Sequence, residues 1–326
     1  MRNREAEYVL PLLRRDRTGE RELLRYLWWT SERMDVTVVD GSERGLFDGL
    51  HELLPPGVQH VVPQHPGLNG KACGVMTGIE ASRWERVVLA DDDVRYGESS
   101  LTALLERLDR ADLVRPQNVY ATYPWQARWD TARMLIGRAF GGDFGGTIGV
   151  RRSAFLAAGG YSTDVLFENL ELERTIRCHG GHVDVARDLY VLRIPPTPVH
   201  FFHQRVRQAY DGFAQPARLV AELAIVPVVA LGVGVRAWRL LGALGIAVIA
   251  IAEVGRRVEG GAHVFRTGAA LWAPLWLLER GAAAWIAVAM RSRGGIVYAD
   301  RRIFSAATPL SLLRRRSSAG RRPSGE

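Results

Sequence analysis

Cysteine is scarce in this chain. Only Cys73 and Cys178 occur among 326 residues, and neither lies in a metal-ligand spacing. The sequence therefore offers no disulfide framework, and free thiols in a reducing compartment are the simple interpretation. The first residues, 1–5, also lack the apolar run of a secretory signal. We therefore expect the domain that begins here to lie in the cytosol.

Acidic residues are also fewer than basic ones. The formal net charge is +8 and the pI is about 10, which favours anionic partners such as nucleotides or acidic lipid. Nucleic acid is not expected, because the arginines concentrate in the tail after Arg291 and do not alternate with aromatic residues on the folded part. Hydrophobic residues make up 47% of the chain, which is enough for a sizeable core.

Short apolar runs alternate with amphipathic segments up to about residue 212. This alternation predicts an α/β domain with a mostly parallel sheet, whose ligands lie beyond the carboxyl ends of the strands. Asp40 and the aspartates 91–93 both follow predicted strands. The predicted strands are 8–13, 35–39, 58–62, 87–90 and 113–114, and the predicted helices are 20–29, 70–82 and 99–110.

Residues 213–292 are more apolar. The runs 219–235 and 240–254 come close to the roughly 20 residues that a spanning helix needs, so they predict a helical hairpin in a membrane. A third run, 268–290, carries Glu279 and Arg280 in its middle. Charges are costly in lipid, so we expect an interfacial helix or a pair of short helices. A buried helical subdomain of a soluble protein is the alternative.

The sequence thus divides into an α/β domain (1–212), a membrane-associated helical region (213–292) and a basic tail (293–326). The tail after Pro309 is expected to be partly disordered, and its arginines suit an anionic, cytosolic membrane face. A two-pass topology would leave both the first domain and the tail in the cytosol.

Three consecutive aspartates, 91–93, close the apolar run 87–90. Adjacent carboxylates repel one another unless a cation or strong hydrogen-bond donors neutralise them. Mg²⁺ or Mn²⁺ that shares oxygen ligands with a diphosphate is the obvious neutraliser. A solvated acidic turn or a helix cap is the alternative, because Asp is common at both.

Several short motifs occur in a definite order around this triplet: Asp40-Gly41-Ser42, 67–71, 91–93, 145–152, 159–161, 167–172 and 204–208. Over about residues 8–210, this succession resembles the family 2 inverting glycosyltransferases with the GT-A fold. It is most similar to their membrane-anchored members of the cellulose-synthase-like and ceramide-glucosyltransferase-like kind. The resemblance implies a GT-A domain, with a Rossmann-like mixed sheet, followed by the C-terminal membrane helices.

The resemblance also implies roles at the donor end. Asp40 aligns with the aspartate that contacts the nucleotide base, and Lys71 matches a basic position near the nucleotide. Gly146 matches the segment that lines the donor sugar and the acceptor, where a missing side chain lets a ligand approach closely. A capping Asp, a solvated Lys and an ordinary bulged strand are the respective alternatives.

The aspartates match the family's D-x-D motif. Asp93, together with Asp91, is implied to hold Mg²⁺ or Mn²⁺ on the diphosphate. Asp91 and Asp92 are also expected to contact the nucleotide sugar.

The acceptor end departs from the family. The usual Glu-Asp pair, whose Asp is the general base, is here Glu168-Asn169, and an amide cannot accept a proton at neutral pH. We favour Glu168 as the base. Glu171, or an acceptor that is already ionised, such as a polyprenyl phosphate, are the alternatives.

Gln204 and Arg207 match the first part of the family's Q-x-x-R-W signature, but Gln208 replaces the Trp. This substitution argues against a long-chain polymerase. Arg207 is expected to neutralise the departing diphosphate, whereas a basic helix on the membrane surface is the alternative. The segment 294–302 loosely resembles a strand that follows the last membrane helix in such enzymes.

The sequence therefore predicts a membrane-bound glycosyltransferase that moves a sugar from a nucleotide-diphosphate donor, with a UDP-sugar favoured, to a lipid or lipid-linked acceptor. The expected location is the cytosolic face of the cell membrane. Asn169 and Gln208 motivate one rival, a non-catalytic membrane scaffold with a degenerate GT-A fold.

Overall fold

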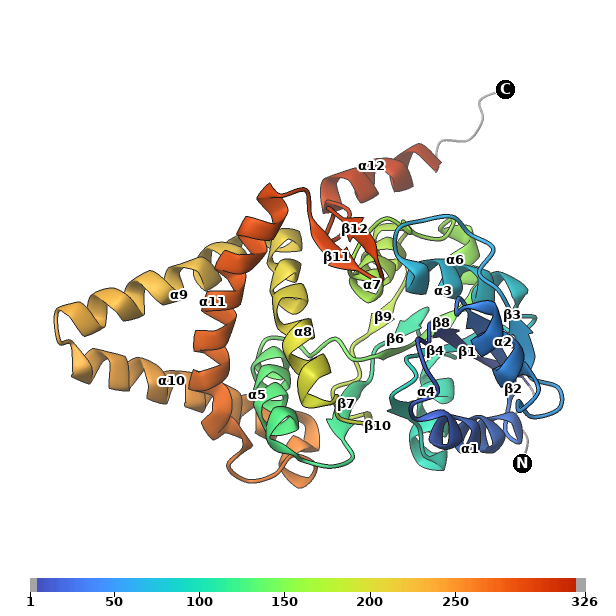
Figure 1. Ribbon diagram of the computed structural model, residues 1–326, viewed down its shortest axis with the longest axis horizontal. Helices are drawn as coiled ribbons and strands as arrows, with labels where there is room; N and C mark the ends of the chain where they lie inside the picture. The colour runs from blue at the N-terminus through green and yellow to red at the C-terminus, as the bar shows by residue number, and fades with distance from the viewer. Residues whose placement is uncertain (1–4, 321–326) are drawn as a thin grey trace.

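The computed structural model describes residues 5–320. Its centre is a seven-stranded sheet with the strand order β3-β2-β1-β4-β8-β6-β9 (Figure 1). The first four of these strands run parallel, whereas β8 is antiparallel to both of its neighbours. The expected mixed α/β sheet is therefore confirmed. Its strands are β1 (Ala6–Leu12), β2 (Asp35–Asp40), β3 (Gln59–Val61), β4 (Arg86–Ala90), β6 (Leu113–Val114), β8 (Thr147–Arg151) and β9 (Val183–Asp184).

Alternate residues of the central strands enter two separate cores, because successive side chains of a strand point to opposite faces. Tyr8 and Leu10 pack in the core that α1 and α4 cover. Val9 packs in the other core, beneath α3, α6 and α7. The sheet thus lies between two helical layers. These helices, with the short α2 at the edge, are α1 (Glu20–Ser31), α2 (Arg44–His51), α3 (Gly70–Ala81), α4 (Glu98–Arg107), α6 (Arg152–Ala157) and α7 (Glu168–Cys178).

A small second sheet stands beside the carboxyl end of β4. It has the order β5-β10-β7, formed by β5 (Val94–Arg95), β10 (Tyr190–Arg193) and β7 (Gln117–Tyr120). Because β5 starts immediately after the aspartate triplet, this sheet brings a strand from about a hundred residues later against the triplet. Helix α5 (Trp125–Ala139) then leads from β7 back toward β8.

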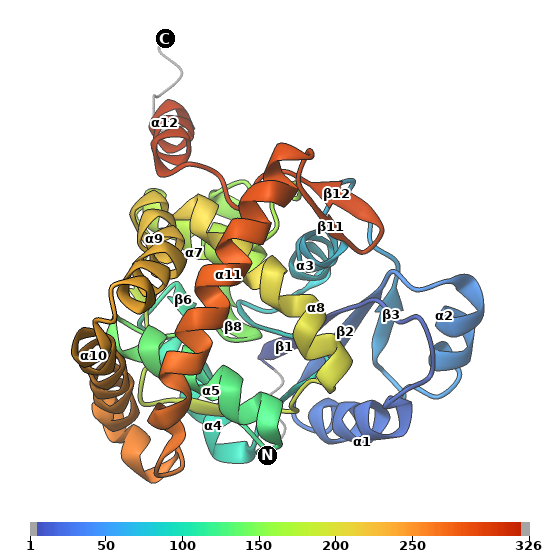
Figure 2. The same cartoon turned by 60° about the vertical axis from the view of Figure 1, so that its left-hand side comes forward.

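The C-terminal third is helical (Figures 1 and 2). Helices α9 and α10 project from the body as a splayed hairpin, and α11 packs against α5, α8 and α9. The helices of this region are α8 (Pro198–Ala209), η1 (Tyr210–Ala214), α9 (Pro216–Gly234), α10 (Trp238–Arg257), η2 (Val258–His263), η3 (Ala269–Trp272) and α11 (Ala273–Ser292).

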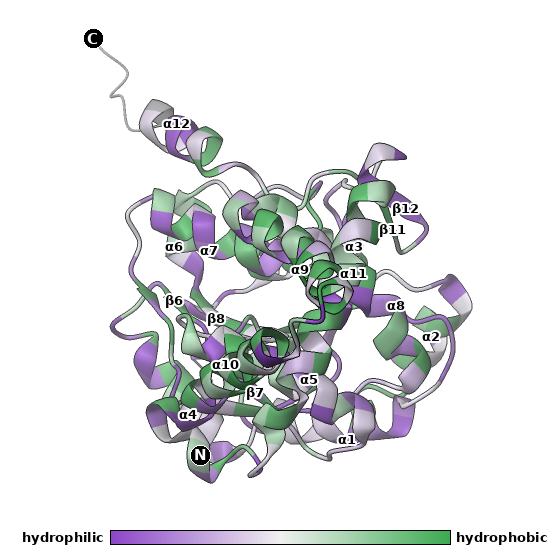
Figure 3. Ribbon diagram, turned by 90° about the vertical axis from the view of Figure 1, so that its left-hand side faces the viewer, coloured by the Kyte–Doolittle hydropathy of each residue, from purple (hydrophilic) through white to green (hydrophobic). Residues whose placement is uncertain are grey.

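Two of these segments are long and apolar enough to cross a membrane, namely Pro216–Gly234 and Trp238–His263. Only 11% of each apolar window is buried within the protein. Figure 3, in which the hairpin faces the viewer, shows apolar residues along both helices. The expected helical hairpin is therefore present, and most of its apolar surface is not covered by the rest of the described chain.

The third apolar run forms one continuous helix, α11, and its charged pair is turned into the protein. Arg280 is 2% exposed, contacts the Asp211 carboxylate, and lies 2.9 Å from the Glu222 carboxylate (Nε to Oε1). Glu279 lies 3.7 Å from Arg205 (Oε2 to Nη1). The expectation of a pair of short helices therefore does not hold, because partners from η1, α8 and α9 compensate these charges.

After α11, a hairpin of β11 (Ile296–Tyr298) and β12 (Arg301–Ile303) returns to the first domain. The segment that follows is ordered as far as the structure describes it, since residues 310–320 form helix α12 (Leu310–Gly320). The Ser317 hydroxyl donates a hydrogen bond to the Cys178 carbonyl at the end of α7. The expected disorder is thus absent from 310–320, and the remainder of the tail lies outside the described residues.

Candidate active site

Strand pairing places the aspartate triplet beside a glycine. Ala90 of β4 pairs with Thr147 of β8, and the Asp91 amide donates to the Gly146 carbonyl at 2.7 Å. A Cβ atom on Gly146 would lie 2.6 Å from Asp91 Oδ2. Only glycine fits here without displacing the carboxylate. Two residues that the sequence analysis assigned to the donor site are thus direct neighbours.

Lys71 joins Asp91 to Glu168. Its ammonium group contacts Asp91 Oδ1 and lies 2.6 Å from Glu168 Oε1. Burial alone would lower the pKa of Lys71, but the two carboxylates raise it well above its ordinary value. Lys71 is also the only lysine in a chain with 43 Lys and Arg residues, a sequence signal that distinguishes it from the many surface arginines.

Asn69 fixes this geometry. Its side-chain oxygen caps α3 by accepting from the amides of Lys71 and Ala72 at 3.1 and 3.2 Å. Its side-chain nitrogen donates to the Val165 carbonyl at 2.8 Å and reaches Glu168 Oε2 at 3.5 Å. One fully buried amide therefore ties the starts of α3 and α7 together.

Arg193 is a site residue that sequence reasoning missed. It comes from β10, and its Nε lies 2.8 Å from Asp93 Oδ2, while Nη2 lies 3.8 Å from Asp91 Oδ2. Burial alone would lower the pKa of Arg193, but Asp93, Tyr120 and Asp91 raise it well above its ordinary value. No local pattern marks it, because its position depends on the pairing of β10 with β5.

Asp92 differs from its two neighbours. Its side chain is exposed at the mouth of the cleft, and no ion pair joins it to a described residue. The surrounding protein removes part of its hydration, and this desolvation, together with the Asp93 and Asp91 carboxylates, raises the pKa of Asp92 to about 6. Of the three carboxylates, only Asp91 and Asp93 are held by cations.

Asp40 lies at the end of β2, and each oxygen of its carboxylate has one partner within the protein. Oδ1 accepts from the Ser42 amide at 2.8 Å, and Oδ2 lies 3.2 Å from His60 Nε2. Although burial opposes ionisation, hydrogen bonds from His60 and Ser42 hold the pKa of Asp40 below its ordinary value. His60 in turn stacks on Phe47, with ring centroids 3.9 Å apart.

Helix α8 carries the predicted Gln204 and Arg207. The Gln204 amide contacts His200 one turn earlier, and the Arg207 guanidinium carbon lies 5.0 Å from the centre of the Tyr298 ring. Among the described residues, no carboxylate forms an ion pair with Arg207. This arginine therefore keeps its charge available to a ligand.

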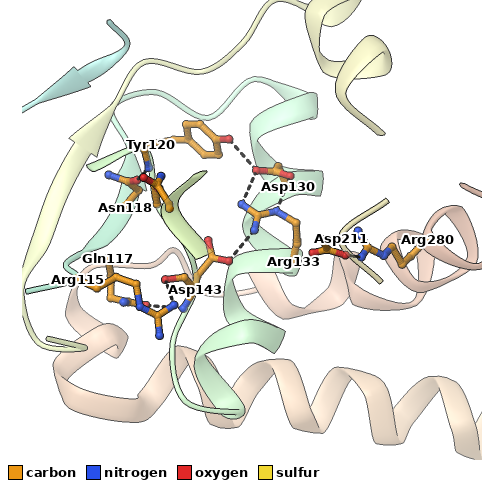
Figure 4. A network of polar contacts seen from close by, with 12 residues as sticks. Arg115, Gln117, Asn118, Tyr120, Asp130, Arg133, Asp143, Asp211 and Arg280 are labelled. Atoms are coloured by element: carbon orange, nitrogen blue, oxygen red, sulfur yellow. Dashed lines mark hydrogen bonds and ion pairs between the residues drawn. The ribbon is translucent and has the colours of Figure 1, made fainter. Parts of the chain in front are cut away.

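The neighbouring Arg205 is used structurally. It pairs with Asp130 at 2.9 Å, in a buried network that also holds Arg133, Asp143 and Tyr120 (Figure 4). Burial would raise the pKa of Asp130, but Arg133 and Arg205 hold it far below its usual range. This network joins α5 to α8, and its Arg133 and Asp143 line the cleft.

The two other candidate groups near Glu168 are occupied. Asn169 donates from its side chain to the Gly145 carbonyl at 3.1 Å. Glu171 is 0% exposed and accepts from the Thr308 amide at 2.7 Å. Glu171 therefore points away from the cleft, and Glu168 is the carboxylate of this segment that faces it.

The predicted site residues share a single cleft of about 2590 Å³. All nine predicted site residues line it: Asp40, Lys71, Asp91, Asp92, Asp93, Gly146, Glu168, Gln204 and Arg207. The hairpin β11–β12 borders the cleft through Tyr298, and its Arg301 contacts the Gly67 carbonyl. From there the cleft continues to apolar side chains of α9 and α11, among them Ile225 and Leu277.

The fit of a divalent metal can be judged from the aspartates. Within residues 5–320, no group of three or more His, Cys, Asp or Glu side chains is arranged to hold a metal ion. Asp93 Oδ1, however, is buried without a hydrogen-bond partner, and Asp91 lies beside it. This donor set fits an ion such as Mg²⁺ or Mn²⁺ that takes a few carboxylate oxygens and completes its shell with phosphate oxygens and water.

Known proteins resemble this chain in structure only. No family model and no curated protein matches the sequence. The mannosyltransferase PcManGT from Pyrobaculum calidifontis, in complex with GDP-Man and Mn²⁺, superposes with a TM-score of 0.53 and 16% identity over 86% of each chain.

Two further structures match more distantly. A candidate nucleotide-diphospho-sugar transferase from Desulfovibrio desulfuricans G20 has a TM-score of 0.37 and 14% identity, covering 59% of this chain and 83% of its own. Residues 1–349 of TarS from S. aureus give 0.41 and 11%, with 63% and 64% covered. The mannosyltransferase match carries the conclusion that the chain has the GT-A-like fold of nucleotide-sugar glycosyltransferases.

Proposed function

We propose that this protein is a membrane-bound glycosyltransferase that moves a sugar from a nucleotide-diphosphate donor to a lipid-linked acceptor, with inversion at the anomeric carbon. The observation that carries the proposal is the cleft, whose lining includes Asp40 and the aspartates as well as apolar residues of α9 and α11. A polar donor and an apolar acceptor could therefore meet in one cavity. The order of the sequence motifs supports the further proposal that the enzyme is related to the cellulose-synthase-like and ceramide-glucosyltransferase-like members of family 2.

At the donor end, Asp40 would contact the base and Lys71 the diphosphate. Asp91 and Asp93 would hold Mg²⁺ or Mn²⁺, which would supply charge neutralisation for the leaving nucleoside diphosphate. Arg207 would add a second positive charge at the same oxygens, because no described carboxylate competes for it. Both UDP- and GDP-sugars suit such a site, and the family resemblance favours UDP.

At the acceptor end, Glu168 would act as the general base. Its Oε1 faces Lys71, whereas Oε2 accepts only a long hydrogen bond from Asn69 at 3.5 Å, so Oε2 would take the proton from an acceptor hydroxyl. The ionised oxygen would then attack the anomeric carbon in line, on the face opposite the diphosphate. Asn169 cannot share this task, because its amide is not basic and is bonded to Gly145.

The apolar hairpin α9–α10 would anchor the protein as two spanning helices in the cell membrane. The catalytic domain and the tail would then share the cytosolic side, with the cleft near the bilayer surface. Buried ion pairs around Arg280 would fasten the catalytic domain to these helices. This placement would give a lipid acceptor a short path to the reacting centre.

The test is a transfer assay with the purified full chain in detergent, using a panel of UDP- and GDP-sugars, Mn²⁺ or Mg²⁺, and a lipid extract as acceptor. We expect transfer from at least one donor, and its loss in Asp93→Asn. Asp109→Asn, an exposed aspartate outside the cleft, is the matched control. Transfer that survives Asp93→Asn unchanged would refute the metal role, and retention of the donor's anomeric configuration would refute inversion.

A non-catalytic scaffold is the second candidate, because Asn169 and Glu168 both have partners within the protein. Calorimetric titration with the same nucleotide sugars plus Mn²⁺ separates the two. Binding together with turnover supports the enzyme, whereas binding without turnover on any acceptor favours the scaffold.

A further inference from the structure

The main chain holds Arg193 firmly against the aspartate triplet. In the β5–β10 pairing, Arg193 is the register partner of Val94, and the Ile194 amide donates to the Asp93 carbonyl at 2.8 Å. The contact of the Arg193 side chain with Asp93 is therefore a consequence of strand register and does not depend on a flexible surface arginine. Its side chain is 18% exposed.

Cations of the protein already pair with most carboxylates of this cluster. Lys71 and Arg193 contact Asp91, Asp93 and Glu168, and Asp92 is the member of the triplet that has no ion pair among the described residues. A divalent cation that approached alone would therefore have to compete with Lys71 and Arg193 for these carboxylates. It would also have to approach within a few ångströms of the Arg193 guanidinium, and such like charges in a partly buried site repel strongly.

One carboxylate oxygen of Asp93 nevertheless has no hydrogen-bond partner. Oδ2 faces Arg193, whereas Oδ1 is buried and has no hydrogen-bond partner. A buried carboxylate oxygen without a partner is costly, so it marks a place for a ligand. The site thus places Asp93 Oδ1, which could bind a cation, close to the Arg193 guanidinium, which repels cations.

We propose that Arg193 is an internal counter-ion of Asp93, and that the site takes up a divalent metal only together with a nucleoside diphosphate. The inference rests on the proposed function, because it assigns Asp93 to the metal. The anionic diphosphate adds the negative charge that balances both the metal and Arg193. Arg193 stays beside Asp93 and also faces the diphosphate, in the cleft that Lys71 and Arg207 line as well.

This role predicts two effects of opposite sign when the Arg193 charge is removed. Metal affinity in the absence of nucleotide rises, because the repulsion disappears. Nucleotide affinity in the absence of metal falls, because the diphosphate loses a cation. An arginine that only stabilised the fold would, if anything, weaken both.

The experiment is a titration of the full chain in detergent with Mn²⁺, followed by the electron paramagnetic resonance signal of the free ion, with and without GDP or UDP. For the wild type, we expect either nucleotide to tighten Mn²⁺ binding at least tenfold. For Arg193→Gln, we expect Mn²⁺ alone to bind about tenfold more tightly than to the wild type, and GDP or UDP in EDTA about tenfold more weakly.

Two controls frame the result. Arg193→Lys keeps the charge and should stay close to the wild type. Arg107→Gln removes an arginine that also pairs with two carboxylates, Asp184 and Asp188, but lies outside the cleft, and it should change neither affinity.

The outcomes separate this inference from the proposed function. If Arg193→Gln binds Mn²⁺ alone no more tightly than the wild type does, the counter-ion role is wrong, even where nucleotide binding and transfer are intact. If the variant gains Mn²⁺ affinity but neither protein binds GDP or UDP, the role of Arg193 at Asp93 stands and the donor assignment fails. Should the variant not fold, wild-type Mn²⁺ binding that is indifferent to both nucleotides would overturn the inference by itself.

Discussion

Replacing Gly146 by alanine tests whether the geometry at Asp91 matters for function. The added methyl would lie 2.6 Å from Asp91 Oδ2, 3.1 Å from Asp91 Cγ and 3.2 Å from Val94 Cγ2. Restoring ordinary contact distances requires a shift of roughly 0.5–1 Å. The carboxylate will take most of it, because Gly146 is fixed by the Asp91 amide and by the Asn118 side chain at 2.7 Å each.

The expected cost is large for activity and moderate for stability. A catalytic group misplaced by about 1 Å costs on the order of 10²-fold in rate, whereas overpacking typically destabilises a protein by about 1–3 kcal/mol. We therefore expect kcat/KM for the donor to fall about 10²-fold in Gly146→Ala while the protein remains folded.

The assay is steady-state transfer at saturating acceptor, with thermal unfolding measured on the same preparation. Gly45→Ala is the control, because a Cβ atom there meets open space within helix α2. Wild-type kcat/KM in Gly146→Ala, within twofold, would show that the position of Asp91 does not govern donor use.

Four further perturbations give separate tests. Lys71→Met leaves two carboxylates without their shared cation, so the donor KM should rise at least about tenfold, with partial rescue in Lys71→Arg. Arg280→Met removes the buried cation between Asp211 and Glu222 and leaves them only the more exposed Arg218, which should cost at most about 3–5 kcal/mol of unfolding free energy in a denaturation assay. The pKa of Asp40 is lowered by the fold, so the ionised carboxylate contributes stability that is complete above the unfolded pKa and is lost as the pH falls through the folded one. Asp40→Asn should therefore be less stable than the wild type at neutral pH and approach it below about pH 4 in acid unfolding. Asn169→Asp should lose the hydrogen bond to Gly145 and gain no rate, whereas a gain of about 10²-fold would show that position 169 supplies the base.

The donor end of the site could be predicted because its groups sit at the ends of neighbouring parallel strands. Strands β2 and β4 both pair with β1, so Asp40 and Asp91 necessarily lie at the same edge of the sheet. The apolar runs that form these strands are short and sharply bounded, and the order of the motifs along the chain supplied the rest. Local pattern therefore sufficed for these residues.

Arg193 could not be predicted in the same way. Its contact with Asp93 spans a hundred positions in the sequence and depends on the antiparallel pairing of two very short strands. Arginine is also the commonest charged residue of this chain, so its presence in one more apolar run carries no information. Only the pairing of β10 with β5 brings Arg193 to the site.

Helix α11 shows a similar limit. Hydropathy marks Glu279 and Arg280 as obstacles to membrane insertion, because it scores each residue without its partners. In the folded chain, Arg280 meets Asp211 and Glu222 from two preceding segments. The cost of burying the charge is thereby offset, and the face of the helix that carries Arg280 packs into the protein beside the cleft.

The acceptor end of the site is shaped by Asn169, Glu168 and Lys71. Asn169 holds the Gly145 carbonyl, so this position braces the turn that carries Gly146 and is not free to contact an acceptor. Glu168 remains at the cleft, but Lys71 lies between it and Asp91. In the proposed reaction, a donor diphosphate would compete with Glu168 for the Lys71 ammonium group. Any movement of Lys71 toward the diphosphate weakens its hold on Glu168 and leaves that carboxylate freer to take a proton. Donor binding and proton acceptance would therefore be coupled through one lysine, and a water molecule that entered an empty site would meet a base that is still held by its counter-ion.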